Sequence, residues 1–282
     1  FTGPYEVLGQ AGIEPFTVGE KATPIRTTMG MTVTPSYTFE NAPPAQLLII
    51  PGGDVQTDNK KIIDWIQQRA KTADYVLSVC NGAFYLAKAG LLDGHEATTF
   101  YNLIDDLQAT YPKVHVVTNK RYVDNGKVIT SAGLSSGIDG TLYLVSKMYG
   151  KGTAQQVALN MEYDWHPGSS YARANFADKY LRRMMSRRLQ LEVPNQVDAK
   201  VVNTQGTTDQ WETQWEVQAN SSPKEVQTYL EGKLQEVGKW SRDGSGWKFT
   251  GDNGEKWAGS LNVAPIDGKQ NSYLINLKIH KI

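Results

Sequence analysis

A short apolar run that passes directly into a helix-forming run is the feature that most constrains this fold. Residues 75–79 read Tyr-Val-Leu-Ser-Val, which is typical of a buried strand. Residues 83–89 read Ala-Phe-Tyr-Leu-Ala-Lys-Ala, which is typical of a helix, and Gly90 follows as a good C-cap residue. Cys80, Asn81 and Gly82 separate the runs, and a glycine lets the backbone pass close behind a sharp turn. We therefore expect a strand–elbow–helix unit with a thiol at the turn.

The thiol at this elbow has two interpretations. Cys80 would face the first free N–H groups of a helix, and these groups and the helix dipole favour negative charge. Such settings can lower the pKa of a cysteine from about 8.5 to roughly 3.5–7.5, which yields the nucleophilic thiolate. Free cysteine is also among the most buried residue types and often serves as a small apolar packing residue. The elbow context favours a functional thiol.

Composition excludes several classes of protein. Basic and acidic residues number 29 each, so no net field favours nucleic acid or an anionic membrane. No apolar run reaches the roughly 20 residues of a membrane span. The single cysteine rules out an internal disulfide framework, and no pair among the four histidines has metal-ligand spacing. We expect a protein without a metal or cofactor that acts on a small-molecule substrate. We also expect it to form a homodimer and to reside in the cytoplasm or the periplasm.

Residues 1 to 192 show the pattern of an α/β domain. Short β-rich runs alternate with amphipathic runs, which predicts a parallel sheet covered by helices on both faces. The expected strands are 46–50, 75–79, 114–118 and 128–131, and the expected helices are 60–72, 83–89 and 138–149.

Residues 197 to 282 differ in character and hold five of the seven tryptophans. We expect a small α+β domain of order β-α-β-β-β, with a strand at 211–217, a helix from 222 to 237, hairpin signals at 243–244 and 252–254, and a closing strand at 271–282. Its tryptophans fit a core better than a ligand platform. Residues 192–196 are expected to link the domains. An expected helix at 171–191 carries a basic cluster that forms a solvated face or a partner contact; the cluster comprises Arg182, Arg183, Arg187 and Arg188.

The elbow and several other segments resemble the ThiJ/PfpI superfamily, which has the class I glutamine amidotransferase-like fold. In chain order they are residues 1–4, 50–53, 78–84, 89–94, 97–99, 130–133, 137–139 and 163–165. The match extends to about residue 190, and it is most similar to isonitrile hydratases and to the amidase-like domains of some bacterial transcription regulators. The resemblance implies a flavodoxin-like parallel sheet sandwiched by helices, with Cys80 as nucleophile.

The resemblance also implies a strand and an acidic residue before the Thr-Gly-Pro segment, and this chain differs from the family pattern at two positions. Relatives place a first strand, and a loop acid that faces the cysteine, before the Thr-Gly-Pro segment at 2–4. Because this chain begins at Phe1, we expect that strand and acid to be missing from it, together with any export signal. Phe100 stands where many members have histidine, which argues against a Cys–His protease. Asn81 stands where isonitrile hydratases tend to have threonine.

Backbone N–H groups near the thiol are candidates for stabilising developing negative charge. The N–H of Asn81 follows the elbow, and those of Gly52 and Gly53 follow a neighbouring strand. A simple tight turn is the alternative interpretation of Pro51-Gly52-Gly53.

Residues 133–137 match the serine-hydrolase pattern G-x-S-x-G, with Ser135 at its centre. A serine hydrolase would need an aspartate and a histidine downstream, for which the candidates are Asp164 with His166 or His280. We favour a glycine-rich turn that lines the same pocket, with Asp139 in the first helical turn. His166 lies in a loop that could reach the pocket mouth.

Two functions follow from these patterns. The first is an enzyme, a hydrolase or lyase, in which a Cys80 thiolate attacks a small carbon–nitrogen or carbonyl compound. The second is a non-catalytic module that keeps the elbow for ligand or redox sensing and uses residues 197–282 for interaction.

Overall fold

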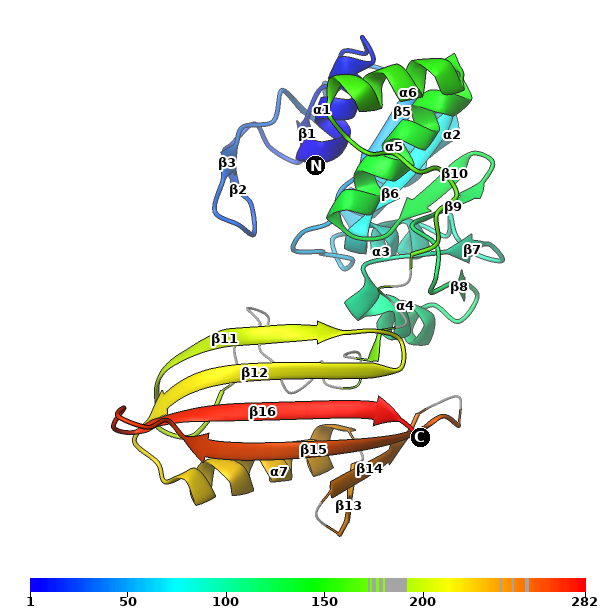
Figure 1. The fold of residues 1–282 in the computed structure, drawn as a ribbon. Helices are drawn as coiled ribbons and strands as arrows, with labels where there is room; N and C mark the ends of the chain where they lie inside the picture. The colour runs from blue at the N-terminus through cyan, green and yellow to red at the C-terminus, as the bar shows by residue number, and fades with distance from the viewer. Residues whose placement is uncertain are drawn as a thin grey trace. The chain divides into compact units, whose positions relative to one another are not determined.

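The computed structural model describes residues 1–171, 173, 176, 177, 180, 192–238, 240–244, 246–251 and 254–282 (Figure 1). Two compact units make up the chain, Phe1–Ala174 and Asn175–Ile282. The linker expected at 192–196 lies inside the second unit. The arginine cluster expected on a helix lies outside the described residues; its members are Arg182, Arg183, Arg187 and Arg188.

The first unit is built on a four-stranded sheet. Its strands are, in spatial order, β5 (Leu47–Ile50), β6 (Tyr75–Val79), β10 (Val128–Ser131) and β9 (Tyr122–Asn125). β5, β6 and β10 are parallel, and β9 runs antiparallel to β10. The carboxyl ends of the three parallel strands therefore meet at one edge, with the end of β6 between the other two.

Helices cover both faces of this sheet, as the sequence predicts. β5 shows why, because successive side chains of a strand point to opposite faces. Leu47 and Ile49 pack with the helices α1 (Thr2–Gln10), α5 (Leu134–Tyr149) and α6 (Lys151–Asn160). Leu48 and Ile50 pack with α2 (Lys60–Thr72) and α3 (Ala83–Lys88) on the other face. The unit is thus a three-layer α/β domain of flavodoxin-like type (Figure 1).

Some elements differ from their predicted bounds. The strand predicted at 114–118 shrinks to β8 (His115–Val116), which pairs with β7 (Glu96–Ala97) outside the main sheet. The helix predicted from 138 begins at Leu134, because Gly133 and not a later glycine serves as its N-cap. Two further pairs of short strands join β1 (Val18–Gly19) to β4 (Tyr37–Thr38) and β2 (Ile25–Arg26) to β3 (Thr32–Val33). A 3₁₀ turn (Tyr101–Leu103) precedes α4 (Ile104–Thr110).

The second unit is a six-stranded antiparallel sheet with one helix, α7 (Pro223–Gly238). In spatial order the strands are β11 (Gln196–Gly206), β12 (Gln210–Ala219), β16 (Ser272–Lys281), β15 (Lys256–Pro265), β14 (Gly246–Thr250) and β13 (Ser241–Asp243). The order along the chain is β-β-α-β-β-β-β, so the prediction missed β11 and counted too few strands. Most side chains of β11 are exposed, so its sequence lacks the alternation that marks a half-buried strand.

Tryptophan packing and a capping box organise this second unit. Trp215, Trp240, Trp247 and Trp257 are buried in its core, which confirms the core interpretation of these side chains. At the start of α7 the Ser222 N–H donates to Glu225 at 2.7 Å, and the Glu225 N–H donates back to the Ser222 hydroxyl at 3.3 Å. Among the described residues, no helix combines the length and the apolar character needed to span a membrane.

Candidate active site

The backbone at Cys80 takes the conformation of a nucleophile elbow. Cys80 has φ 58°, in the left-handed region that costs a non-glycine residue about 1–3 kcal/mol. Two hydrogen bonds hold it there. Its N–H donates to the Ala132 carbonyl at 2.9 Å, and the Thr99 hydroxyl donates to the Cys80 carbonyl at 2.8 Å. The elbow predicted from the sequence is therefore formed, between β6 and a 3₁₀ turn (Cys80–Gly82) that leads into α3.

Two glycines allow the elbow to meet the end of β5. A Cβ on Gly82 would lie 2.3 Å from the Ile50 carbonyl oxygen, so only glycine fits there without movement. A Cβ on Gly52 would lie 2.8 Å from Cys80 Cβ and 3.2 Å from Cys80 Sγ. The structure thus brings the predicted Pro-Gly-Gly turn against the thiol.

The Asn81 side chain joins the elbow to the same turn. Its Oδ1 accepts from the Gly53 N–H at 2.9 Å, and its Nδ2 donates to the Gly53 carbonyl at 2.8 Å. The Gly53 N–H, one of the predicted oxyanion donors, is therefore already paired in this geometry.

Burial changes the expected ionisation of the thiol. Desolvation raises the pKa of the Cys80 thiol above its ordinary value, against a smaller lowering by a hydrogen bond from the Asn81 backbone. The prediction of a lowered pKa is wrong for this geometry. Burial in this geometry therefore favours the thiol over the thiolate.

Ser135 and Asp139 belong to a network that sequence reasoning found only in part. Asp139 forms a salt bridge with Arg121 Nε and accepts a hydrogen bond from the Tyr163 hydroxyl at 3.0 Å. Arg121 also donates to the Ser135 hydroxyl at 3.1 Å. Burial and the charge of Asp139 raise the pKa of Tyr163 to about 12, so Tyr163 keeps its proton at neutral pH. No local motif marks Arg121, which lies 18 residues from its carboxylate partner.

This network bears on the serine-hydrolase alternative. In a catalytic triad the serine hydroxyl bonds to a histidine, whereas the Ser135 hydroxyl bonds to Arg121. His166 Nε2 instead pairs with Asp164 at 2.8 Å, and their side chains are 70% and 89% exposed. The geometry of these residues gives no support to a serine nucleophile.

Aromatic and cationic side chains gather on the loops beside the elbow. Phe100 follows Thr99, and its ring lies 3.1 Å from where a Cβ on Gly133 would stand. Its ring also packs edge-on against Tyr101, and the Arg173 guanidinium lies over Tyr101 at 4.3 Å. Phe100 is therefore a packing residue of this loop.

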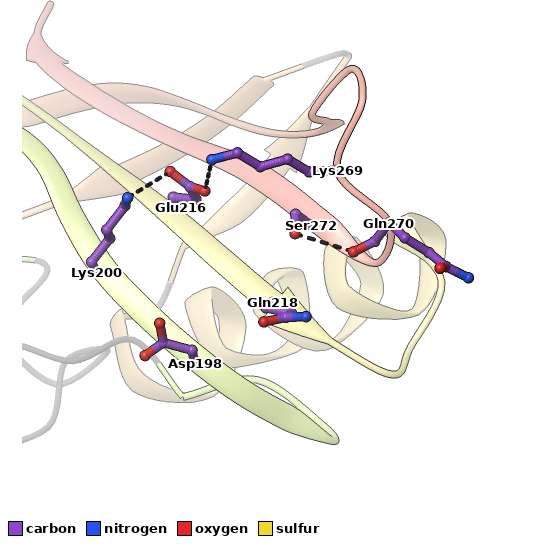
Figure 2. Close-up of a pocket in the computed structure, with 7 residues that line it drawn as sticks. All are labelled: Asp198, Lys200, Glu216, Gln218, Lys269, Gln270 and Ser272. Carbon is purple, nitrogen blue, oxygen red and sulfur yellow. Dashed lines mark hydrogen bonds and ion pairs between the residues drawn. The ribbon is translucent and has the colours of Figure 1, made fainter.

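A pocket in the second unit offers a different kind of surface. It lies on the outer face of the sheet, where Glu216 of β12 pairs with both Lys200 and Lys269 (Figure 2). Its other lining groups are uncharged apart from Asp198, so cations and anions balance there. Among the described residues, no cluster of three or more histidine, cysteine or acidic side chains has the arrangement of a metal site.

Comparison with known proteins places this elbow in a family. Residues 1–147 match the model of the DJ-1/PfpI family. The chain belongs to the DJ-1/PfpI family. Its relatives include the isonitrile hydratase of Pseudomonas putida, 35% identical over 166 residues, which are 57% of this chain and 72% of that protein. The transcriptional regulators GbdR and CdhR of Pseudomonas aeruginosa (strain PAO1) are 26% and 30% identical over 48% of this chain, which spans only 37% and 40% of their lengths.

A solved structure supports the same family fold. The chain is similar to a ThiJ/PfpI family protein from Pseudomonas syringae, with a TM-score of 0.54 and 29% identity over 59% of this chain and 70% of that one. The family resemblance expected from the sequence is thereby confirmed.

Replacing Gly82 tests the contact between the elbow and β5. We expect Gly82→Ala to destabilise the first unit by about 1–3 kcal/mol, because the new methyl group overlaps the Ile50 carbonyl. Urea unfolding, followed by reaction of Cys80 with a disulfide reagent, reports on this unit, since Cys80 is the only thiol. Gly53→Ala is the matched control, since no heavy atom lies within 4 Å of its added Cβ. Equal stability of the two variants would contradict the packing described.

Replacing Arg121 tests the buried network. Arg121→Met leaves the Asp139 carboxylate, 6% exposed, without its cation, and we expect a loss of about 3–5 kcal/mol in the same assay. Lys60→Met breaks an exposed ion pair with Asp64 and is expected to cost less than about 1 kcal/mol. Similar losses in both variants would show that Asp139 does not depend on Arg121.

The ionisation of Cys80 can be measured by alkylation. The rate with iodoacetamide follows the thiolate fraction, so a raised pKa moves the midpoint of the pH–rate profile upward. We expect the folded protein to show a higher midpoint than the same protein unfolded in guanidinium chloride. A lower midpoint of the pH–rate profile in the folded protein would contradict the raised pKa and support the thiolate predicted from the sequence.

Proposed function

We propose that this protein is a cysteine-nucleophile enzyme of the isonitrile hydratase type, which hydrates or hydrolyses a small carbon–nitrogen compound. The main support is Cys80 itself, held at a positive φ with its sulfur against the Pro-Gly-Gly turn. The isonitrile hydratase of Pseudomonas putida, matched over 72% of its length, supports the substrate class.

A protonated thiol suits this chemistry. When the Cys80 thiol adds to an isonitrile R–N≡C, the sulfur bonds to the terminal carbon and the thiol proton moves to that same carbon. The product is a thioformimidate, R–N=CH–S–Cys. Water then adds to that carbon, the C–S bond breaks, and the thiol regains a proton while the formamide R–NH–CHO leaves. The sum is hydration of the isonitrile, and the thiol supplies both the nucleophile and the first proton.

A second candidate function is a ligand- or redox-sensing module without catalysis. It is favoured by the matches to GbdR and CdhR, whose names describe transcriptional regulators. Within this function the raised pKa of Cys80 favours ligand sensing over redox sensing, because redox-sensing cysteines react as thiolates. In this function the second unit would serve for interaction with a partner.

Turnover of a small alkyl isocyanide separates the two functions. For the enzyme we expect formamide to accumulate, detected by mass spectrometry, and Cys80→Ala to reduce the rate to that of buffer. His166→Ala is the matched control, since His166 lies exposed beside Asp164, and it should keep the wild-type rate. Tight binding of a small ligand without turnover of isocyanides, nitriles or amides would favour the sensor instead.

A further inference from the structure

One side chain uses both backbone hydrogen-bonding groups of Gly53. Asn81 Oδ1 accepts the Gly53 N–H at 2.9 Å, and Asn81 Nδ2 donates to the Gly53 carbonyl at 2.8 Å. Only one orientation of the amide satisfies both bonds, because the flipped group would place donor against donor and acceptor against acceptor. The pairing is therefore specific to an amide at this position.

The pairing acts directly beside the thiol. Gly52 lies between the end of β5 and Gly53, and a Cβ there would stand 2.5 Å from Asn81 Oδ1 and 3.2 Å from Cys80 Sγ. The Asn81 amide and the Cys80 sulfur thus border the same glycine. Asn81 holds the turn against the elbow at this point, 28 residues away in sequence.

An N–H group beside the attacking sulfur can stabilise the oxyanion that forms from a carbonyl substrate. Attack of sulfur on an ester or amide turns the carbonyl oxygen into an oxyanion, and each well-placed donor for it is worth about 10²–10³ in rate. The Gly53 N–H directly follows Gly52, which borders the sulfur, and it donates to Asn81 Oδ1. Addition of a thiol to the terminal carbon of an isonitrile creates no oxyanion, so it needs no such donor.

We propose that Asn81 is a positioning and specificity-determining residue, which fixes the turn beside Cys80 and withholds the Gly53 N–H from bound substrate. The site thereby loses one of its three candidate oxyanion donors, which disfavours acyl-transfer substrates relative to substrates that accept the thiol without forming an oxyanion. This role presupposes that Cys80 is the nucleophile proposed above.

Two reagents that attack the same thiol isolate the effect. With p-nitrophenyl acetate, the C–S bond forms through an oxyanion, p-nitrophenolate leaves, and the thiol proton passes to solvent. With iodoacetamide, the C–S bond forms as iodide leaves and the proton again passes to solvent, but no oxyanion develops. The ratio of acylation rate to alkylation rate therefore reports on oxyanion stabilisation and cancels changes in the thiolate fraction of Cys80.

Asn81→Ala frees the Gly53 N–H, and we expect it to raise this ratio at least tenfold over the wild type. Asn81→Asp is the comparison variant, since it loses the bond to the Gly53 carbonyl but keeps an oxygen that accepts from the Gly53 N–H, and it should leave the ratio at or below the wild-type value. Where the alanine variant unfolds, Asn81→Ser gives the same measurement, because its hydroxyl is too short to reach both groups of Gly53. An unchanged or lower ratio in the folded variant, or an equal rise in Asn81→Asp, would overturn the proposal.

Neither reagent is a natural substrate. A wild-type protein that turns over no isocyanide would count against the proposed enzyme, yet the ratio would still test the role of Asn81.

Discussion

The contact of Gly82 with the end of β5 sets the geometry on which the rest of the site depends. β6 lies between β5 and β10, so the segments after all three strands meet at one edge of the sheet. The elbow fits under the Ile50 carbonyl only because residue 82 has no side chain. That approach carries the Cys80 sulfur to Gly52 and leaves the Cys80 N–H within reach of the Ala132 carbonyl. Strain at Cys80 is thus held by contacts from both neighbouring strands.

Position and activation of the thiol are separate properties of this site. The elbow places the sulfur where a substrate beyond the strand ends would meet it. The same close packing removes water from the thiol, and desolvation then outweighs the hydrogen bond from the Asn81 backbone in setting its pKa. A protonated thiol favours reactions in which the sulfur and its proton are both used, over reactions that start from a thiolate.

Local sequence patterns predict those features of the fold that neighbouring residues determine. The bounds of α2 and β6 follow from periodicity, and the elbow follows from a cysteine and a glycine between a strand and a helix. β11 was missed because its side chains are mostly exposed and do not alternate. The pairing of Asn81 with Gly53 and of Arg121 with Asp139 joins residues 28 and 18 positions apart, which no local pattern encodes. Burial depends on the whole fold, and it raises the pKa of Cys80 against the direction that the elbow pattern predicts.

Enzymes and regulators are both among the relatives of this chain, so the elbow alone does not separate catalysis from sensing. What distinguishes the two is the set of groups around the sulfur. The Thr99 hydroxyl donates to the Cys80 carbonyl, and the Asn81 amide hydrogen-bonds with Gly53. Both side chains therefore stabilise the elbow rather than a reacting group. Chemistry at Cys80 must then rely on the reactivity of the substrate and on the thiol proton. In the reaction proposed above, the isonitrile carbon takes both the proton and the sulfur of the thiol, whereas an unactivated amide offers no such acceptor carbon.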